Sequence, residues 1–375
     1  MKNIALIGST GSIGRQVLNV VRRHSDKYNI VSLSAGSNVS LLKEQIKEFN
    51  PKIATSSVEF STEEFTDVEF FFGENAFVDA IIDADVVVVS LVGFKGILAV
   101  LRAIDKGIDI ALANKESLVV GGDIVTKKVK EKGVNIFPID SEHSAIWQVL
   151  NYDYKKPFKN LILTASGGAF RDFDYKDLKQ ATALDALKHP NWTMGNKITI
   201  DCATLVNKAF EVIEAKWLYD TTFDNIKAII HRESIIHSMV EFEDNSVLAQ
   251  MSYPTMEIPI TVALNFPQRI DCGVKSLDFA KLGSLTFSEI DDRRFPCFKL
   301  VLDGAKKGGG YPAVINGANE QAVKMFLNNK ISYFDIYKSI DMCLNAYSNN
   351  YDGTFESLNY ANEFAVNKVI EQFGE

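Results

Sequence analysis

The stretch KNIALIGSTGSIGRQVLNVV, residues 2–21, decides the fold of the N-terminal part of this chain. Its apolar run 2–7 predicts a β-strand, and the glycine-rich segment GSTGSIG, residues 8–14, follows directly. Valines at helical spacing within residues 17–21 then predict a helix. This order is typical of dinucleotide-binding domains, where the helix N-terminus faces a pyrophosphate. The glycine spacing differs from the usual GxGxxG, so glycines that only tighten a strand–helix turn remain an alternative.

Strand and helix patterns continue to alternate after this unit. The expected strands are residues 29–34, 53–55, 85–90, 109–113 and 135–139. Such alternation predicts a doubly wound parallel sheet, with the ligand at the carboxyl ends of the strands. Lys115 lies at one of these ends, although a lysine in a first helical turn also serves solubility.

The segment after the second strand bears on the choice of dinucleotide. An NAD site usually carries an acidic residue there to bind the ribose hydroxyls. This chain has Gly36, Ser37 and Asn38 instead. The absence of an acid favours NADP.

Two acidic residues follow the strand 135–139. Asp140 and Glu142 would project to the same side if the extended conformation persisted. Like charges so close together need a cation, and with Glu211 they would form an all-carboxylate site for Mg²⁺ or Mn²⁺. The alternative is a pair of acids capping a following helix, expected at 144–150.

The stretch HPNWTMGNKITIDCATLVNKAFE, residues 189–211, combines a loop with a polar helix face. Proline and glycine interrupt residues 189–195, which predicts a mobile lid carrying one large aromatic side chain. We expect a strand over 197–200 and a helix from about residue 203. Asn207, Lys208 and Glu211 then share one helix face, which suits an anionic, metal-bridged ligand or, alternatively, a solvated Lys–Glu pair.

The remaining sequence predicts a second sheet and a helical end. Ser166 and the two glycines after it form a plausible anion-binding turn behind a strand at 161–164. His237 lies in an apolar run, where a histidine is more often a satisfied core residue. The other expected elements are strands 226–230 and 246–252, an irregular connector 268–292, helices 298–307, 313–327, 333–348 and 358–373, and a glycine turn 308–310.

Composition limits the classes of function and partner. The chain has 375 residues, 46% of them hydrophobic, and a net charge of −8, which argues against nucleic acid and anionic membranes as partners. No apolar run approaches the length of a membrane span, and the N-terminus opens directly into a strand pattern, which predicts no signal peptide. The four cysteines lie far apart without CxxC spacing, which is typical of reduced thiols in a cytoplasmic protein.

Seven motifs in order resemble the 1-deoxy-D-xylulose 5-phosphate reductoisomerase family of the non-mevalonate isoprenoid pathway. They are GSTGSIG (8–14), LANKES (112–117), DSEH (140–143), ASGGAF (165–170), HPNWTMG (189–195), ATLVNKAFE (203–211) and IIHSMVEF (235–242). The resemblance implies a homodimer. It also implies a Rossmann-like NADPH-binding domain (1–150), an α+β catalytic domain (151–270) with a flap (189–195), a linker (271–295) and a small C-terminal helical bundle (296–375).

The resemblance further implies roles for individual residues. Those expected to bind NADPH are Thr10, Gly11, Ser12, Ile13, Gly36, Ser37, Asn38, Asn114, Lys115, Glu116 and Gly195. The metal ligands for Mg²⁺ or Mn²⁺ would be Asp140, Glu142 and Glu211, and the catalytic set would add Lys115, His189 and Trp192. The substrate would contact Ser141, Glu142, Ser166, His189, Cys202, Asn207, Lys208, Glu211, His237 and Met256.

The implied reaction rearranges the carbon skeleton of a small phosphorylated sugar and then reduces the resulting aldehyde with NADPH. The sequence departs from the family at Cys202, often a serine, at Ser37, a lysine in some members, and at Ala165, a glycine. Two other functions compete with this one. A different NADP-linked dehydrogenase would leave the three carboxylates unexplained, and a catalytically silent nucleotide sensor would not need all of them.

Overall fold

The computed structural model describes residues 1–374, which form two compact units. The first, called here the N-terminal unit, comprises residues 1–117, 125–144 and 256–274. The second, the C-terminal unit, comprises residues 118–124, 145–255 and the chain from 275 onward. This division gives the segment 256–270 to the N-terminal unit, whereas the sequence places it with the expected catalytic domain. The functional division of the chain stays a prediction.

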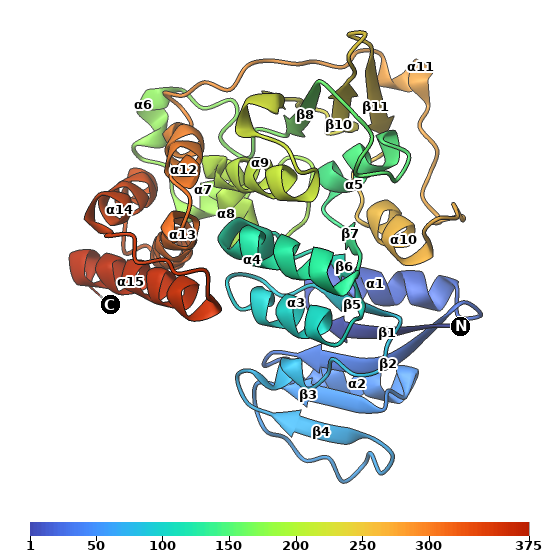
Figure 1. Ribbon diagram of the computed structural model, residues 1–375. Helices are drawn as coiled ribbons and strands as arrows, with labels where there is room; N and C mark the ends of the chain where they lie inside the picture. The colour runs from blue at the N-terminus through green and yellow to red at the C-terminus, as the bar shows by residue number, and fades with distance from the viewer. Residues whose placement is uncertain (375) are drawn as a thin grey trace. The chain divides into compact units, whose positions relative to one another are not determined.

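The N-terminal unit is built on a seven-stranded sheet in the order β4-β3-β2-β1-β5-β6-β7 (Figure 1). Every strand pair is parallel, and the order reverses at β1, which lies between β2 and β5. This confirms the predicted parallel, Rossmann-like sheet. The strands are β1 (Lys2–Ile7), β2 (Tyr28–Ala35), β3 (Ile53–Ser56), β4 (Glu69–Phe72), β5 (Val86–Val89), β6 (Asp109–Leu112) and β7 (Ile136–Pro138).

The helices of this unit bury apolar faces on or near the sheet. In α1 the buried side chains include Val17, Leu18 and Val21, which recur at helical spacing. The helix α3 packs against β5 and β6, and α10 packs against β6, β7 and α1. The helices are α1 (Ser12–Arg23), α2 (Val39–Phe49), η1 (Ala76–Val78), α3 (Gly96–Asp105), α4 (Glu116–Lys132) and α10 (Glu257–Asn265). Residues 118–124 of α4 are counted with the C-terminal unit.

Three contacts explain why the late segment 256–274 belongs to the N-terminal unit. Lys2 Nζ donates a hydrogen bond to Leu264 O at 2.7 Å. Tyr28 donates its hydroxyl to Asn265 Oδ1 at 3.2 Å. Arg23 forms an ion pair with Glu257 at 3.0 Å. The sequence does not predict α10, because its apolar residues 258–264 follow a turn signal and show no amphipathic period.

The C-terminal unit contains a four-stranded mixed sheet in the order β11-β10-β8-β9. The pair β8–β9 is parallel, and the other two pairs are antiparallel. The strands are β8 (Asn160–Ala165), β9 (Ile226–Ile230), β10 (Ile236–Glu241) and β11 (Val247–Met251). Strands 161–164, 226–230 and 246–252 are therefore confirmed. The apolar run around His237 is β10 itself.

Helices α5 and α9 supply much of the core that covers this sheet. The buried apolar cluster consists of Ile146, Leu150, Leu161, Leu163, Val212, Ala215, Tyr219, Ile226 and Val240. The helices between β7 and β11 are α5 (Ser141–Val149), α6 (Tyr175–Leu178), α7 (Ala183–Ala186), α8 (Asn196–Thr204), α9 (Val206–Leu218) and η2 (Phe223–Asn225).

The four C-terminal helices that the sequence predicts are all present, and Figure 1 shows them as one group. They are α12 (Pro296–Lys306), α13 (Tyr311–Leu327), α14 (Tyr333–Ala346) and α15 (Phe355–Phe373). The glycine turn 308–310 joins α12 to α13, as expected. The connector 268–292 is mostly irregular, but it includes α11 (Phe279–Leu282) and a β-bridge from Ser288 to Ile230.

The predicted strand at 197–200 is wrong, because these residues lie in α8. Gly195 caps this helix in an extended conformation. Thr199, Ile200 and Ala203 are buried at helical spacing, so packing of the helix face overrides the strand preference of β-branched residues. The helix ends at Leu205, whose φ is 58°, before α9 begins.

The extended conformation assumed for Asp140 and Glu142 is also wrong. The helix α5 begins at Ser141, three residues before the predicted start at 144. Glu142 therefore lies in the first helical turn and Asp140 immediately precedes it. The two acids come close through a strand–helix turn instead of strand alternation.

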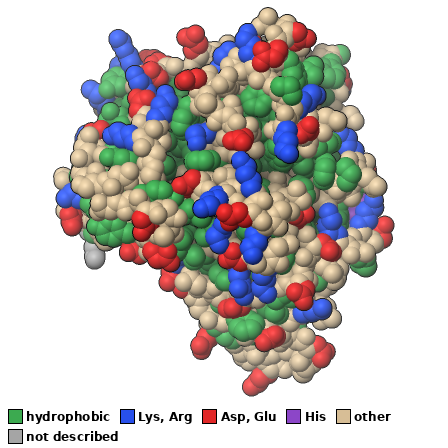
Figure 2. Space-filling model, in the orientation of Figure 1, with side chains coloured by type: hydrophobic (Ala, Val, Ile, Leu, Met, Phe, Trp, Pro, Cys, Tyr) green, Lys and Arg blue, Asp and Glu red, His purple; other side chains and the backbone are tan. Residues whose placement is uncertain are grey.

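No helix among residues 1–374 is both long and apolar enough to cross a membrane. On the face shown in Figure 2, acidic and basic side chains are scattered among each other.

A substitution at Gly14 tests the packing of the first turn. A Cβ atom at Gly14 would lie 2.2 Å from the carbonyl oxygen of Gly8, a backbone atom that cannot move aside easily. We expect Gly14→Ala to lower the free energy of unfolding by about 1–3 kcal/mol. A Cβ at Gly36 would meet no atom within 4 Å, so Gly36→Ala is the matched control. Urea denaturation measures both, and equal stability of the two variants would show that Gly14 is not needed for this close approach.

Candidate active site

The glycine turn after β1 lies where the strand order of the N-terminal sheet reverses. Gly8 has φ of +95°, and a Cβ there would lie 2.8 Å from Ser90 O at the end of β5. The turn is held by hydrogen bonds from the Gly8 and Ser9 amides to Ser34 O, at 3.0 and 2.7 Å. The strands β1, β2 and β5 thus converge on this turn.

The N-terminus of α1 fits a dinucleotide pyrophosphate. Within the described chain, no side chain caps the helix at Gly11, and its first turn contains no acid. The free amides and the positive end of the helix dipole therefore face outward next to Thr10, Ser12 and Ile13.

The turn after β2 is open to solvent and carries no acidic side chain. Gly36, Ser37 and Asn38 are all exposed. Asn38 caps α2 by accepting a hydrogen bond from the Leu41 amide at 3.3 Å. Gly36 O accepts one from Ser56 Oγ at 2.9 Å. No acid is therefore present in this turn to repel an anionic ligand.

Asn114 ties together the carboxyl ends of β5 and β6. Its amide donates to Leu91 O at 3.2 Å, to Gly93 O at 3.0 Å and to Glu116 Oε2 at 2.9 Å. Its oxygen accepts from the Ser117 amide at 3.1 Å. The Asn114 side chain is thus occupied in shaping the loop.

Lys115 and Asp140 form an ion pair at the same edge of the sheet. The distance from Lys115 Nζ to Asp140 Oδ2 is 2.5 Å, and only 8% and 13% of the two side chains are exposed. Next to them, Ser141 donates its hydroxyl to Glu142 Oε2 at 2.5 Å. This edge thus presents two carboxylates and one ammonium group.

The turn after β8 packs directly on helix α8. Gly167 and Gly168 have φ of +82° and +64°, and a Cβ at Gly168 would lie 2.5 Å from Cys202 O. Only glycine fits at Gly168, because the obstructing atom belongs to a helix backbone. Ser166, in the same turn, and Cys202 are both half-buried.

His189 contacts this turn from the flap. Its Nε2 lies 2.9 Å from Ser166 Oγ, and its Nδ1 accepts hydrogen bonds from the amides of Asn191 and Trp192. Burial, and then the positive charge of Arg171, lowers the pKa of His189 to about 4, so the ring is neutral at pH 7.

The flap also contacts the loop between β9 and β10 and the strand β10. The Asn191 side chain donates to Arg232 O at 2.6 Å and to Ser234 Oγ at 2.8 Å. The Trp192 ring lies edge-on to His237, with the ring centroids 6.2 Å apart. The Trp192 side chain remains partly exposed, so its packing within the chain is incomplete.

His237 is a buried residue with a polar partner. Its Nε2 lies 2.9 Å from Ser252 Oγ, and burial lowers its pKa to about 4. The core interpretation of this histidine thus fits its surroundings, and it also faces the flap tryptophan. Ser252 has no sequence signal that distinguishes it, since a serine at a strand end is part of no pattern.

The polar face predicted on α9 is present, and it is buried. Asn207 Nδ2 donates to Glu211 Oε1 at 2.5 Å, and Lys208 Nζ pairs with Glu211 Oε2. Glu211 is 1% exposed and Lys208 2%. The alternative of a solvated Lys–Glu pair is therefore wrong. Burying a charged pair at this depth costs desolvation free energy, so the pair is more easily explained by a role in ligand binding than by stability.

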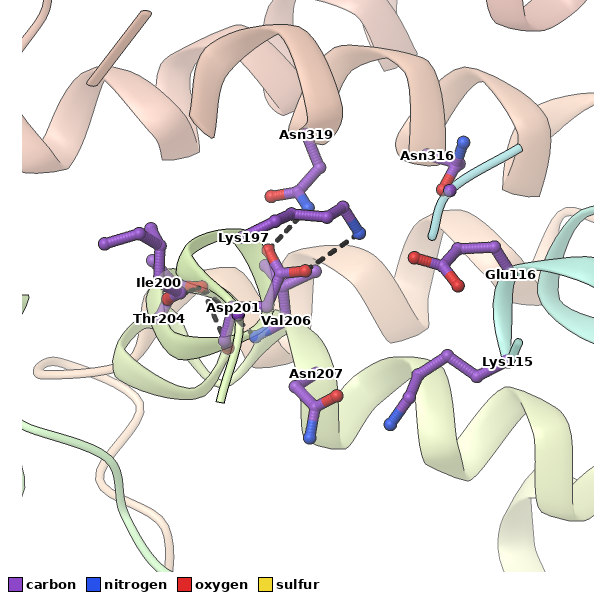
Figure 3. Close-up of polar contacts among 12 residues, drawn as sticks. Lys115, Glu116, Lys197, Ile200, Asp201, Thr204, Val206, Asn207, Asn316 and Asn319 are labelled. Carbon is purple, nitrogen blue, oxygen red and sulfur yellow. Dashed lines mark hydrogen bonds and ion pairs between the residues drawn. The ribbon is translucent and has the colours of Figure 1, made fainter. Parts of the chain in front are cut away.

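A second buried ion pair holds the start of α8 (Figure 3). Lys197 Nζ lies 2.9 Å from Asp201 Oδ2. The other oxygen of Asp201 accepts a hydrogen bond from Asn319 of α13 at 2.8 Å. This network attaches the helix that follows the flap to the C-terminal helices.

The predicted site residues thus form two groups, one in each unit. The N-terminal group comprises Thr10, Gly11, Ser12, Ile13, Gly36, Ser37, Asn38, Asn114, Lys115, Glu116, Asp140, Ser141, Glu142 and Met256. The C-terminal group comprises Ser166, His189, Trp192, Gly195, Cys202, Asn207, Lys208, Glu211 and His237. The parallel sheet and its glycine turn define a nucleotide-dependent oxidoreductase architecture, with a second unit rich in anion-binding groups.

Comparison with known proteins identifies the family. Family models match residues 4–122 (1-deoxy-D-xylulose 5-phosphate reductoisomerase), 136–219 (its C-terminal domain) and 251–365 (DXP reductoisomerase C-terminal domain). The 1-deoxy-D-xylulose 5-phosphate reductoisomerase of Caldanaerobacter subterraneus subsp. tengcongensis is 48% identical over 365 residues, 96% of each chain.

Solved structures agree over the whole chain. A DOX-P reductoisomerase in complex with NADPH, fosmidomycin and magnesium has a TM-score of 0.94, with 36% identity and complete coverage of both chains. The Zymomonas mobilis enzyme in complex with NADPH has a TM-score of 0.92, with 36% identity over 99% of both chains. The chain belongs to the 1-deoxy-D-xylulose 5-phosphate reductoisomerase family.

Trp192 tests whether the flap responds to substrate. Burying its partly exposed ring over a ligand would contribute roughly 1.5–3 kcal/mol, enough to offset part of the cost of ordering the loop. We expect Trp192→Ala to raise KM and lower kcat/KM, with little change in cofactor affinity. Wild-type fluorescence should change on adding a phosphonate substrate mimic, and Trp192→Phe should abolish this change, because Trp147 and Trp217 lie outside the flap. An unchanged signal in Trp192→Phe, together with wild-type kinetics in Trp192→Ala, would identify the loop as a static connector.

Proposed function

We propose how the residues of this chain divide the work of its family's reaction. The protein converts 1-deoxy-D-xylulose 5-phosphate to 2-C-methyl-D-erythritol 4-phosphate, with NADPH and Mg²⁺, in isoprenoid precursor biosynthesis. The observation that carries this function is the match of the whole chain to the family. In this assignment Mn²⁺ also serves, because it shares the preference of Mg²⁺ for carboxylate oxygens.

All of the residues assigned to the cofactor except Gly195 belong to the N-terminal unit. Thr10, Gly11, Ser12 and Ile13 bind the pyrophosphate, which the free amides at the start of α1 support. Gly36, Ser37 and Asn38 receive the 2′-phosphate, which the absence of an acid there supports. The nicotinamide end is assigned to Asn114, Lys115, Glu116 and Gly195.

The metal role is assigned to Asp140, Glu142 and Glu211. An all-oxygen, three-carboxylate set matches the preference of Mg²⁺. Two of these acids pair with lysines, Asp140 with Lys115 and Glu211 with Lys208. An ammonium group therefore lies beside each of these two carboxylates, which suits an anionic substrate next to the metal.

The substrate phosphate is assigned to Ser166, Asn207 and Lys208, with Cys202 at a position where the family often has serine. A thiol is a weaker hydrogen-bond donor than a hydroxyl, so the other three donors carry the phosphate contact. Ser141 is assigned to the backbone oxygens of the substrate, and His237 and Met256 are also assigned to substrate binding. The flap residues His189 and Trp192 exclude water.

The chemistry follows from these assignments. When bound, the cation polarises adjacent substrate oxygens and stabilises developing negative charge, while the nicotinamide supplies the hydride. Lys115 holds a positive charge beside the carboxylates, and the phosphate-binding residues keep the substrate chain in one orientation. A closed flap retains the aldehyde intermediate until it is reduced.

Two further assignments concern assembly and compartment. We assign a homodimer, supported by the sheet-edge strand β11, where Val247 and Leu248 are 45% and 53% exposed. A cytoplasmic location is supported by the four cysteines, none of which forms a disulfide among residues 1–374.

The direct test is substrate-dependent oxidation of NADPH. We expect turnover with 1-deoxy-D-xylulose 5-phosphate, loss of turnover with a chelator, and recovery with Mg²⁺ or Mn²⁺. A different dehydrogenase would ignore this substrate, and a nucleotide sensor would bind NADPH without oxidising it.

Glu211→Gln tests the metal assignment. The amide preserves the shape of the side chain but removes one negative charge from the proposed ligand set. We expect turnover to be abolished, while NADPH affinity, measured by fluorescence titration, stays within about twofold because the glycine turn belongs to the other unit. Near-normal turnover at ordinary Mg²⁺ concentrations would refute the assignment.

Ser37→Lys tests the cofactor assignment. A charged hydrogen bond to the 2′-phosphate contributes about 1.5–3 kcal/mol, so affinity for NADPH should improve more than affinity for NADH. Dissociation constants for both dinucleotides measure the effect, and equal improvement would place the 2′-phosphate elsewhere.

A further inference from the structure

Two neighbouring groups contact the Ser166 hydroxyl oxygen. The Gly168 amide donates to Ser166 Oγ at 3.2 Å. The His189 Nε2 lies 2.9 Å from the same oxygen. Whether this second contact also uses an acceptor position depends on which ring nitrogen of His189 carries the proton.

The flap backbone determines that proton's position. His189 Nδ1 accepts from the Asn191 amide at 3.2 Å and from the Trp192 amide at 3.0 Å. A nitrogen that accepts hydrogen bonds carries no proton. The neutral ring therefore has its proton on Nε2, and Nε2 donates to Ser166 Oγ.

These two contacts leave the Ser166 hydroxyl able to form only one more hydrogen bond. A hydroxyl has two acceptor lone pairs and one proton, and both lone pairs are occupied. The Ser166 proton must then be donated outward. Arg171 strengthens the arrangement, because it donates to Ser166 O at 3.3 Å and to Arg232 O at 2.9 Å, which ties the turn to the loop that the flap contacts.

We propose that His189 is a positioning residue that makes Ser166 an obligate hydrogen-bond donor, so that the Ser166 proton is directed to an unprotonated oxygen of the substrate phosphate. The inference rests on the proposed role of Ser166 in phosphate binding. His189 would act on the phosphate through Ser166. The same ring links the flap backbone to the phosphate site.

A pair of amide substitutions separates the two functions of the ring. In His189→Asn, the amide oxygen lies near the position of Nδ1, so the acceptor for the flap amides is kept and the donor to Ser166 is lost. In His189→Gln, an amide N–H lies near the position of Nε2, so the donor is kept and the flap acceptor is lost. Each variant is the control for the other.

The probe is methyl phosphate, with its affinity measured by calorimetry on the full chain. We expect His189→Asn to weaken binding about three- to tenfold, as for one hydrogen bond, and His189→Gln to change it less than about twofold. Ser166→Ala should weaken binding, and adding His189→Asn to it should weaken binding no further. Additive losses, or wild-type affinity in His189→Asn, would overturn the inference.

The contrast between the two amide variants supplies a readout that a purely structural role would not move. A purely structural role of His189 would make His189→Asn and His189→Gln lose affinity for methyl phosphate alike, and this result would contradict the proposal.

Failure of this inference is distinguishable from failure of the proposed function. If Ser166→Ala weakens methyl phosphate binding but His189→Asn does not, only the role of His189 is refuted. If Ser166→Ala binds methyl phosphate as tightly as wild type, both the phosphate role of Ser166 and the inference are overturned. The reductoisomerase activity itself is tested separately by substrate-dependent NADPH oxidation of the wild-type chain.

Discussion

Pairing of buried carboxylates with lysines is the constraint on which the site depends. Asp140 pairs with Lys115, Asp201 with Lys197, and Glu211 with Lys208. An isolated charge at such depth would cost several kcal/mol, so each partner makes the burial of the other tolerable. Two of these pairs belong to the candidate active site, and the third anchors the helix after the flap.

The same pairing bears on the ligands proposed above. Asp140 and Glu211, which are assigned to the metal, each pair with a lysine. In that assignment a divalent ion would bind the carboxylates and the substrate phosphate would bind lysine. Such local cations would be needed in a protein whose overall charge of −8 repels a phosphorylated substrate.

Hydrogen bonds hold the segment 189–195 against the rest of the C-terminal unit. His189 links the turn after β8 to the backbone of this segment, and Asn191 binds the loop after β9. The segment leads directly into α8, where Lys197 and Asp201 join the C-terminal helices. The helices of the C-terminal unit thereby support the segment that carries Cys202 and leads to Lys208.

The sequence by itself determined the parallel sheet, the glycine turn, the C-terminal helices and the shared face of Asn207, Lys208 and Glu211, because each rests on local periodicity or turn chemistry. Only the tertiary structure decided that this face is buried, that 197–200 is helical and that 256–274 joins the N-terminal unit. These features depend on side chains distant in sequence: burial of Ile200 and Ala203 outweighs strand preference, and Arg23 and Lys2 capture a segment more than two hundred residues away. The protonation of His189 belongs to the same class, since burial and Arg171 set it and no local pattern encodes either.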